Sequence, residues 1–332
     1  MSDFQTARAM FGDYPTIELI DARRQRRVRI ALHGATVLAI EVQHGTRVHD
    51  FADGYRSPED LAARPGSRFA IMLPFANRIA DARYAFDGQS HDLQPGVENE
   101  RSARHGFVRD LDFAVDELGA DADGAHASFV CAIGAEQFPG YPFALALTVR
   151  YTLDADGLAL TVTMRNTGTQ DAPCFFGWHP YFRVGDTPLD RWELHLPADA
   201  TIRTDAAAIP LPGAAAQQPL DAVPALDFRT PRAIGALHLD NGFAALHADA
   251  DGRIRSVLRD PASGLGVAMW QEHGIALAFS GDSLAQRPRQ SVALEPMESW
   301  TNAFNRPECA DTIRLPAGQS RTFRCGVEWL GL

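Results

Sequence analysis

Alternation of apolar and polar residues over short segments constrains the fold of this chain more than any other feature of its sequence. In residues 142–153, PFALALTVRYTL, every second residue from Leu145 onward is large and apolar, and the residues between them are Ala, Thr or Arg. After the turn DADG, residues 158–166 repeat the pattern. A period of two places the apolar side chains on one face of a strand. The two segments therefore predict a β-hairpin with one buried face and one Thr-rich, half-open face.

Similar patterns predict further strands, separated by clusters of Gly, Pro, Asp and Asn. Helical periodicity is scarce, and the best candidate is a short helix with Ser57 as its N-cap and Pro58 in its first turn. Closely spaced strands with few helices indicate an all-β fold, a large β-sandwich. The Ala- and Pro-rich segment 205–233 is interpreted as a long loop, so we expect one domain over residues 1–332. The additional strands are expected at 28–32, 35–42, 84–86, 126–132, 243–247, 253–259, 275–279, 291–296 and 321–329.

Composition excludes several classes of protein. All 31 basic residues are arginine, and Schiff-base chemistry, pyridoxal phosphate attachment and a Walker-type phosphate loop each require a lysine. The net charge of −11 argues against a nucleic-acid partner. The basic run RRQRR at 23–27 is best interpreted as the solvated tip of a hairpin. Four scattered cysteines without a C-x-x-C pair predict reduced, mostly buried thiols.

Membrane and secretory signals are missing from the sequence. No apolar run approaches the ~18 residues that a membrane helix needs. The first residues, MSDFQTARAMFGDYP, lack the basic-then-apolar pattern of a secretory signal. We therefore expect a cytoplasmic protein with no membrane partner.

Two polar clusters in the first third of the chain are candidates for a binding site. Asn77 and Arg78 lie between apolar runs in residues 71–88, where they form either a local turn network or a hydrogen-bonding wall for a polar ligand. His105 is followed by Gly106, which lets the backbone come close to whatever the histidine faces. The residue types alone leave both interpretations open.

A third cluster, SVALEPMESW at 291–300, contains Glu295. Alternation places Ser291, Ala293 and Glu295 on the strand face that points away from the core. The two small side chains should leave an open floor beside the carboxylate, on which a ligand could lie. Glu295 is either a surface acid or a general base, and its small neighbours favour the base.

The segment FGWHPYFRV at 175–183 places His179 among four aromatic residues and before Pro180. His179 is either a core histidine with backbone partners or a proton donor held rigidly beside an aromatic floor. The histidines at 238, 247 and 273 lack ligand spacing, so no metal site is expected. Neither a Gly-x-Ser-x-Gly elbow nor a Gly-x-Gly-x-x-Gly turn after a strand is present. Two histidines, an arginine and a carboxylate suit proton transfer on an uncharged polar substrate.

These segments resemble the aldose 1-epimerase (galactose mutarotase) family. The matching blocks occur in family order from about residue 34 to the C-terminus, and this order is more specific than any single motif. They are PFANRIADARYAFDG, RHGFVRDLDF, WHPYFRV, PALDFRTPRAIG, LDNGF and VALEPMESWTNAFNRPE.

The resemblance implies a galactose mutarotase-like β-supersandwich and an isomerase that needs no metal or cofactor. It implies that Glu295 is the catalytic base and His179 the proton donor. It also implies that Arg78, His105 and Asp240 bind the sugar, and we place Asn77 in the same binding site. The implied partner is a small-molecule sugar, acted on by a monomer or homodimer. On this basis the histidine among aromatic residues is a proton donor.

Three alternatives remain at this stage. The first is a hexose-6-phosphate 1-epimerase in which Arg101 or Arg104 holds the phosphate. The second is a sugar hydrolase or lyase that uses Glu295 with Glu298 or Asp240. The third is a non-catalytic sugar-binding domain of the same fold, which would not need both histidines and the glutamate.

Overall fold

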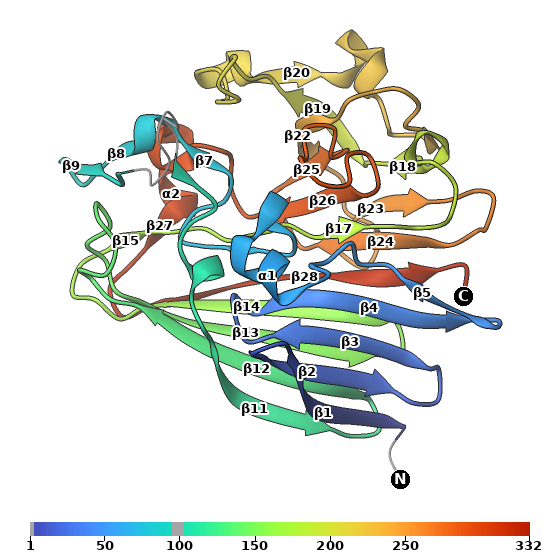
Figure 1. The fold of residues 1–332 in the computed structure, drawn as a ribbon. Helices are drawn as coiled ribbons and strands as arrows, with labels where there is room; N and C mark the ends of the chain where they lie inside the picture. Colours follow the sequence, from blue (N-terminus) through green and yellow to red (C-terminus); the bar gives the residue numbers. More distant parts are fainter. Residues whose placement is uncertain (1–2, 95–102) are drawn as a thin grey trace.

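The computed structural model of the chain describes residues 3–94 and 103–332, and antiparallel strands form most of it (Figure 1). The first sheet contains five strands that follow one another along the chain. They are β1 (Phe4–Phe11), β2 (Tyr14–Asp21), β3 (Arg26–Ala31), β4 (Thr36–His44) and β5 (Arg47–Asp50).

The second sheet has nine strands and packs behind the first, where β2 contacts β12 and β13 (Figure 1). Tyr151 links the two layers, because its hydroxyl donates a hydrogen bond of 2.9 Å to the carbonyl oxygen of Ala35. In spatial order the strands are β11 (Ala114–Ala120), β12 (Gly124–Ile133), β13 (Leu145–Asp154), β14 (Gly157–Asn166), β28 (Ser320–Leu330), β24 (Gly266–Gln271), β23 (Ile254–Arg259), β18 (Glu193–His195) and β21 (Arg232–Ala233).

The third sheet has eight strands and carries the residues discussed below as the candidate site. Its order is β20 (Gln217–Pro219), β19 (Ala198–Ile202), β22 (Asp240–Leu246), β25 (Ile275–Phe279), β26 (Val292–Met297), β16 (Gly177–Trp178) and β6 (Ile71–Met72), with β17 (Tyr181–Phe182) paired to β26. Three short pairs complete the described strands: β7 (Arg78–Ile79) with β10 (Ala103–Arg104), β8 (Arg83–Phe86) with β9 (Gln89–Asp92), and β15 (Ala172–Pro173) with β27 (Arg314–Leu315).

Helices are few and short, as the sequence predicts. The helix α1 (Pro58–Ala63) begins at the expected N-cap, where the Ser57 hydroxyl accepts a hydrogen bond of 3.2 Å from the backbone N–H of Asp60. Its one buried side chain is Leu61. The second helix, α2 (Ala310–Ile313), is a single turn, and the other helical segments of the described chain are 3₁₀ turns.

The all-β prediction is confirmed, and every strand expected from the alternating pattern overlaps an observed one. In the predicted hairpin, buried and half-buried residues alternate along β13 without a break. The basic run at 23–27 lies at the turn between β2 and β3 and at the start of β3. The interpretation of 205–233 as a loop is only partly right, because this segment contains β20, which extends the third sheet, and β21, which lies at the edge of the second.

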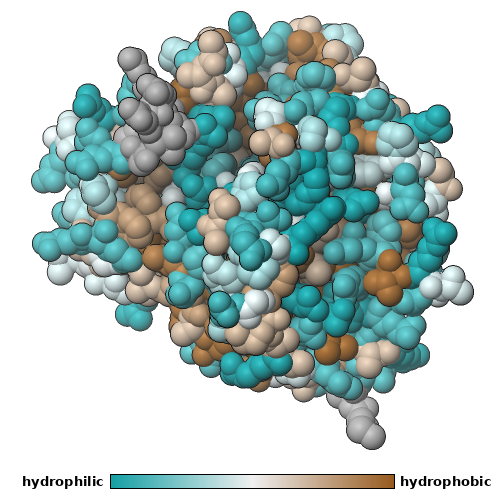
Figure 2. All heavy atoms as spheres, in the orientation of Figure 1, coloured by the Kyte–Doolittle hydropathy of each residue, from teal (hydrophilic) through white to brown (hydrophobic). Residues whose placement is uncertain are grey.

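The surface shown in Figure 2 is mostly hydrophilic, and its hydrophobic residues are scattered rather than gathered into one patch. Among the described residues, the exposed large apolar side chains are Met10, Val48 and Leu332, which lie far apart in the sequence. No helix in residues 3–94 and 103–332 is long and apolar enough to cross a membrane.

Candidate active site

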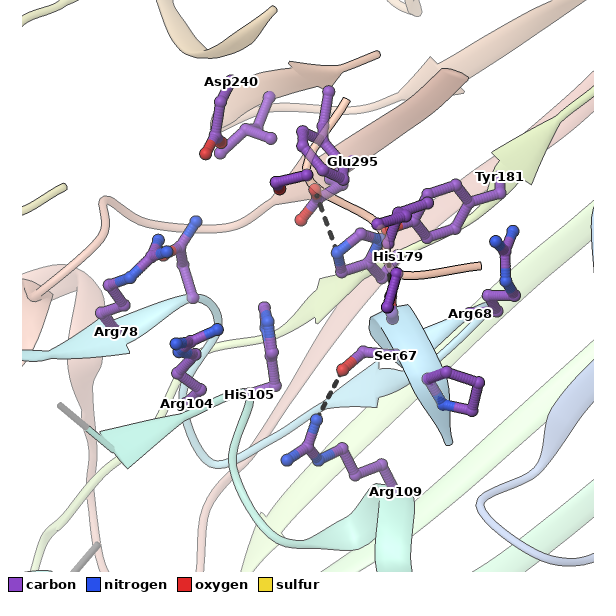
Figure 3. A pocket seen from close by; sticks show the side chains of 18 of the residues that line it. Ser67, Arg68, Arg78, Arg104, His105, Arg109, His179, Tyr181, Asp240 and Glu295 are labelled. Atoms are coloured by element: carbon purple, nitrogen blue, oxygen red, sulfur yellow. Dashed lines mark hydrogen bonds and ion pairs between the residues drawn. The ribbon is translucent and has the colours of Figure 1, made fainter. Parts of the chain in front are cut away.

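A cavity of about 440 Å³ lies over one face of the third sheet. All six residues that the sequence analysis names for the site line this cavity: Asn77, Arg78, His105, His179, Asp240 and Glu295. Figure 3 shows Asp240, Glu295 and His179 on one side of the cavity, with Arg78, Arg104, His105 and Arg109 on the other. Segments far apart in the chain therefore meet in one polar cavity.

Strand register explains why the sheet side of the cavity carries its particular residues. Across neighbouring strands, Asp240 lies opposite Phe279, and Phe279 lies opposite Ala293. Ala293 in turn lies opposite Tyr181. Directly opposed residues point to the same face of a sheet, and so do residues two apart on a strand. Glu295, two residues beyond Ala293, therefore shares the face of Tyr181, Phe279 and Asp240.

One detail of the predicted floor is wrong. Ser291 and Ala293 do not leave an opening beside Glu295, because both are fully buried. The Ser291 hydroxyl donates a hydrogen bond of 2.7 Å to the buried carboxylate of Asp53. The apolar part of the lining comes instead from Leu277 and Phe279 on β25. Phe279 lies directly opposite Ala293, and Leu277 lies directly opposite Glu295.

His179 and Glu295 form the centre of the cavity. The imidazole Nε2 lies 3.3 Å from Glu295 Oε1, and the two side chains are 8% and 2% exposed. Within the described chain, Glu295 Oε2 and His179 Nδ1 are buried and lack a hydrogen-bond partner. Buried polar atoms of folded proteins nearly always have partners. A ligand with hydroxyl groups could supply the missing partner of Glu295.

The imidazole of His179 has a fixed orientation. It stacks on the Tyr181 ring with 4.8 Å between ring centroids and 8° between the planes. The backbone of His179 is held by Ala70, whose carbonyl oxygen accepts its N–H at 3.1 Å, and by Phe69, whose N–H donates to its carbonyl oxygen at 2.8 Å. Pro180 follows, and a residue before proline favours an extended backbone. His179 is thus a buried histidine with backbone partners that also faces a carboxylate.

Burial disfavours the charged form of each member of this pair. It lowers the pKa of His179 to about 3, and the nearby positive charges of Arg109 and Arg68 act in the same direction. Burial also raises the pKa of Glu295 well above its ordinary value, and the charge of Asp240 adds to this increase. Burial thus favours the forms of the pair in which the two groups share one proton, because the pair then has no net charge whichever group holds it.

The opposite side of the cavity comes from β7, β10 and the turns that follow them. Arg78 lies opposite Arg104 in this small sheet and donates a hydrogen bond of 2.9 Å to Asn77 Oδ1. The carbonyl oxygen of Asn77 accepts the backbone N–H of His105 at 2.8 Å. Asn77 and Arg78 thus form a local turn network and also line the cavity, so the two interpretations of this cluster are compatible.

His105 is placed by close backbone packing. Its Nδ1 lies 2.8 Å from the Met72 sulfur, and its ring centroid lies 5.3 Å from that of His179. Gly106 has a φ of 62°, and a Cβ atom there would lie 2.1 Å from the carbonyl oxygen of Leu73. The glycine therefore permits a close approach, as predicted, but the approach is to Leu73 rather than to a ligand.

Several lining residues were not found from the sequence. Arg68 and Ser67 come from the turn after α1, and Arg109 follows His105 by four residues and donates a hydrogen bond of 2.6 Å to the Ser67 hydroxyl. Arg109 lies in the quoted HGFVRD block, so that block could have suggested it. Arg68 has no such signal, because one arginine in a Pro- and Gly-containing turn resembles many others. Arg101, named for a phosphate, lies outside the described residues.

In the described part of the chain, no three His, Cys, Asp or Glu side chains gather in a way that could hold a metal ion. The acid–base pair, the arginines and the amide are instead suited to hydrogen bonding and proton transfer.

Comparison with known proteins agrees with this geometry. The aldose 1-epimerase family matches the chain over residues 15–328. The chain belongs to the aldose 1-epimerase family. Its relatives include the uncharacterized Escherichia coli protein YihR, which is 30% identical over 252 residues and matched over 75% of each chain. The aldose 1-epimerase of the same bacterium is 30% identical over 186 residues, which make up 54% of this chain and 51% of that enzyme.

Solved structures place the chain in the fold of this family. A galactose mutarotase-like protein from Clostridium acetobutylicum superposes with a TM-score of 0.83 and 15% identity over 98% of each chain. The galactose 1-epimerase of Lactobacillus acidophilus superposes with a TM-score of 0.81 and 16% identity over the full length of both chains. The fold is therefore the galactose mutarotase-like β-supersandwich that the resemblance of sequence blocks implied.

Proposed function

We propose that this member of the aldose 1-epimerase family interconverts the α and β anomers of a free aldose. The observation that carries the proposal is the buried His179–Glu295 pair, with 3.3 Å between Nε2 and Oε1, at the centre of a cavity lined by hydrogen-bonding groups. A buried acid and base that share one proton are what ring opening and closure require. The reaction needs no metal or cofactor.

The proposed mechanism moves two protons in each half-reaction. With the shared proton on His179, Glu295 accepts the proton of the C1 hydroxyl while His179 donates to the ring oxygen. The bond between C1 and the ring oxygen breaks, and C1 becomes an aldehyde. After rotation about the C1–C2 bond, the hydroxyl that was the ring oxygen attacks the opposite face of C1. His179 takes back its proton, and Glu295 returns its own to the C1 oxygen.

The remaining residues of the cavity hold the sugar during these steps. Arg78 and His105 can donate hydrogen bonds to sugar oxygens and stabilise negative charge as it develops. Asn77 supports the Arg78 guanidinium through their 2.9 Å hydrogen bond. Asp240, on β22 at the opposite side of the cavity, can accept hydrogen bonds from ring hydroxyls. We expect the enzyme to act in the cytoplasm as a monomer or homodimer.

Polarimetry on the purified protein tests the proposal. Freshly dissolved α-glucose and α-galactose should reach anomeric equilibrium faster with the protein than in buffer, in proportion to enzyme concentration. The Glu295→Gln variant serves as the matched control for contaminating mutarotase. A rate equal to that of buffer for every aldose tested, with sugar binding retained, would instead identify a non-catalytic sugar-binding domain.

A second candidate substrate is an aldose that carries an anionic group, such as a hexose 6-phosphate. Arg78, Arg104 and Arg109 all line the cavity, while Asp240 is the only carboxylate there besides Glu295 among the described residues. Arginine binds phosphate oxygens with a forked pair of hydrogen bonds. Coupled assays on glucose and glucose 6-phosphate separate the candidates, because a much higher kcat/KM for the phosphate would favour the anionic sugar.

A further inference from the structure

A buried carboxylate outside the cavity joins several segments that line it. Asp53 lies in the segment of the chain that connects β5 to α1, and its side chain is fully buried. It accepts hydrogen bonds from the guanidinium groups of Arg68 and Arg287 and, at 2.7 Å, from the Ser291 hydroxyl. Its backbone N–H donates to the carbonyl oxygen of Tyr181 at 2.9 Å. Three separate segments of the chain, at residues 68, 181 and 287–291, therefore meet at Asp53.

Each partner of Asp53 is tied to the wall of the cavity. Arg68 and Tyr181 line it directly. Arg287 directly follows residues 283–286, which line the cavity. Ser291 immediately precedes β26, the strand that carries Glu295. Movement of the Asp53 carboxylate would thus be transmitted to both members of the acid–base pair.

The path from Asp53 to His179 runs through two ring contacts. The Arg68 guanidinium carbon lies 4.8 Å from the centroid of the Tyr181 ring, within the range of a cation–π interaction. The Tyr181 ring stacks on the His179 imidazole, and the Tyr181 hydroxyl donates a hydrogen bond of 3.0 Å to the carbonyl oxygen of Gly66. The Tyr181 ring is therefore held at its face by Arg68 and at its tip by the turn before Arg68.

We propose that the buried Asp53–Arg68 ion pair is a positioning device for the acid–base pair. It holds the Tyr181 ring on which the His179 imidazole stacks, and through Ser291 it holds the start of the strand that carries Glu295. This inference rests on the proposed function, because it assigns Arg68 and Asp53 to the rate of proton transfer rather than to sugar binding. Misplacement of a reacting group by about 1 Å can cost ~10²-fold in rate.

Arg306 provides a matched control for the loss of a buried arginine. Like Arg68, it is almost fully buried and pairs with a carboxylate, that of Glu308. Its guanidinium carbon also lies over an aromatic ring, 5.1 Å from the centroid of Trp300. Arg306 does not line the cavity. Arg68→Met and Arg306→Met should therefore lose comparable stability, while only Arg68→Met should impair catalysis.

The experiment compares kcat, KM and the pH profile of four variants with those of the wild type. In Arg68→Met, kcat should fall by about 10- to 100-fold while KM changes by less than about threefold. Arg68→Lys keeps the charge but not the planar fork, so it should recover only part of the loss. Ser291→Ala removes one hydrogen bond from Asp53 and should fold even if Arg68→Met does not; its kcat should fall by severalfold. Arg306→Met should keep both constants.

The pH profile separates positioning from general destabilisation. The groups that face the His179 imidazole are Glu295, Tyr181, His105, Arg68 and Arg109. Loss of the Arg68 charge should raise the pKa of His179, because a nearby positive charge disfavours the imidazolium. The acidic limb of the kcat profile should therefore move to higher pH in Arg68→Met and stay in place in Arg306→Met.

A measurement without sugar keeps this inference separate from the proposed function. The NMR signals of the His179 imidazole should shift in Arg68→Met and Ser291→Ala but not in Arg306→Met. This result is independent of whether the wild-type protein anomerises any sugar. Folded Arg68→Met with unchanged kcat and unmoved His179 signals would overturn the proposal. A rise in KM alone would also overturn it, because Arg68 would then be a direct sugar contact.

Discussion

Glu295 and His179 are nearly inaccessible to solvent, yet each keeps a buried polar atom without a partner among the described residues. Leaving such an atom unpaired typically costs ~1–3 kcal/mol, so a purely structural pair would be expected to satisfy both atoms. The buried carboxylate of Glu298 is satisfied in this way, because it pairs with Arg321 Nε at 2.6 Å and accepts the backbone N–H of Phe176 at 2.9 Å. The contrast supports proton transfer at Glu295 and structural stabilisation at Glu298.

The first prediction concerns the acid–base pair itself. Glu295→Gln keeps the size of the side chain but cannot accept the C1 proton, so kcat should fall by ~10²–10⁴-fold while sugar affinity changes little. His179→Asn removes the donor to the ring oxygen and should behave similarly. Because acid and base act as a unit, the double variant should lose less than the product of the single losses. Polarimetry gives the rates and calorimetric titration the affinities. Near-normal turnover in Glu295→Gln would rule out this base.

Arg78→Ala should behave differently from both variants. Arg78 lines the cavity in which we propose that the sugar binds, so its loss should remove ground-state binding as well as stabilisation of developing charge. KM should rise and kcat should fall together. A change in kcat alone would assign Arg78 to the transition state only, and no change in either would remove it from the site. The same kinetic assay provides the measurement.

The histidines also predict how stability depends on pH. Burial lowers the pKa of His105 well below its ordinary value, so below about pH 6.5 the unfolded chain binds a proton there that the folded chain does not. Stability should therefore fall as the pH decreases from about 6.5, by at most ~1.4 kcal/mol per pH unit from this residue. Between about pH 4.5 and 6.5 the contributions of His179 and Glu295 largely cancel, because the folded pair holds one proton and the unfolded His179 also holds one.

Urea unfolding at several pH values checks this expectation. In His105→Asn, the free energy of unfolding should depend less steeply on pH between about pH 5 and 6.5. His238→Asn, at a side chain that is 76% exposed, is the control for the removal of an imidazole from the surface. An unchanged slope in His105→Asn would mean that this imidazole titrates alike in the folded and unfolded states.

Strands were predictable where one face is buried and the other is not. The hairpin of β13 and β14 shows this pattern over its whole length. All six residues of β24 are buried, so its sequence lacks the alternation that marks a strand, and β24 was not predicted. The edge strand β1 is mostly exposed or half-buried and was missed for the opposite reason. How far such a strand is buried depends on which other sheets pack against it, and the local sequence pattern carries no information about that packing.

Gly106 gives a prediction about how the close backbone packing beside His105 holds the site. Gly106→Ala would place a Cβ atom 2.1 Å from the Leu73 carbonyl oxygen at a φ of 62°, so backbone must shift beside His105. We expect a loss of more than ~1 kcal/mol in stability together with reduced kcat. Gly88→Ala is the matched control, because Gly88 has a φ of 77° but no atom within 4 Å of the new Cβ. Thermal unfolding and polarimetry on both variants separate the effect of the steric clash, which occurs only at Gly106, from the effect of a positive φ, which both positions share.

The overall charge of the molecule proved a weak guide to its site. A net charge of −11 favours a neutral sugar, yet Arg78, Arg104 and Arg109 gather at the cavity. The net charge is a sum over the whole molecule, whereas the electrostatic potential in the cavity depends on which charged side chains folding brings together there. The six site residues were found because the order of motif blocks resembles a known family. Neither composition nor periodicity could have assembled them.

The arrangement of the chain between sheets leads to the last prediction, that residues 1–332 unfold as one unit. From β17 onward the chain passes repeatedly between the eight- and nine-stranded sheets, so neither sheet is a continuous segment that could fold alone. One core cluster joins buried residues from Phe4 to Trp329. Calorimetry should therefore show a single transition whose enthalpy, at ~0.7 kcal/mol per residue, is about 230 kcal/mol. Its van't Hoff enthalpy should equal the calorimetric one. Two separated transitions, or a protease-resistant fragment that keeps the N-terminal five-stranded sheet alone, would show that the chain contains more than one domain.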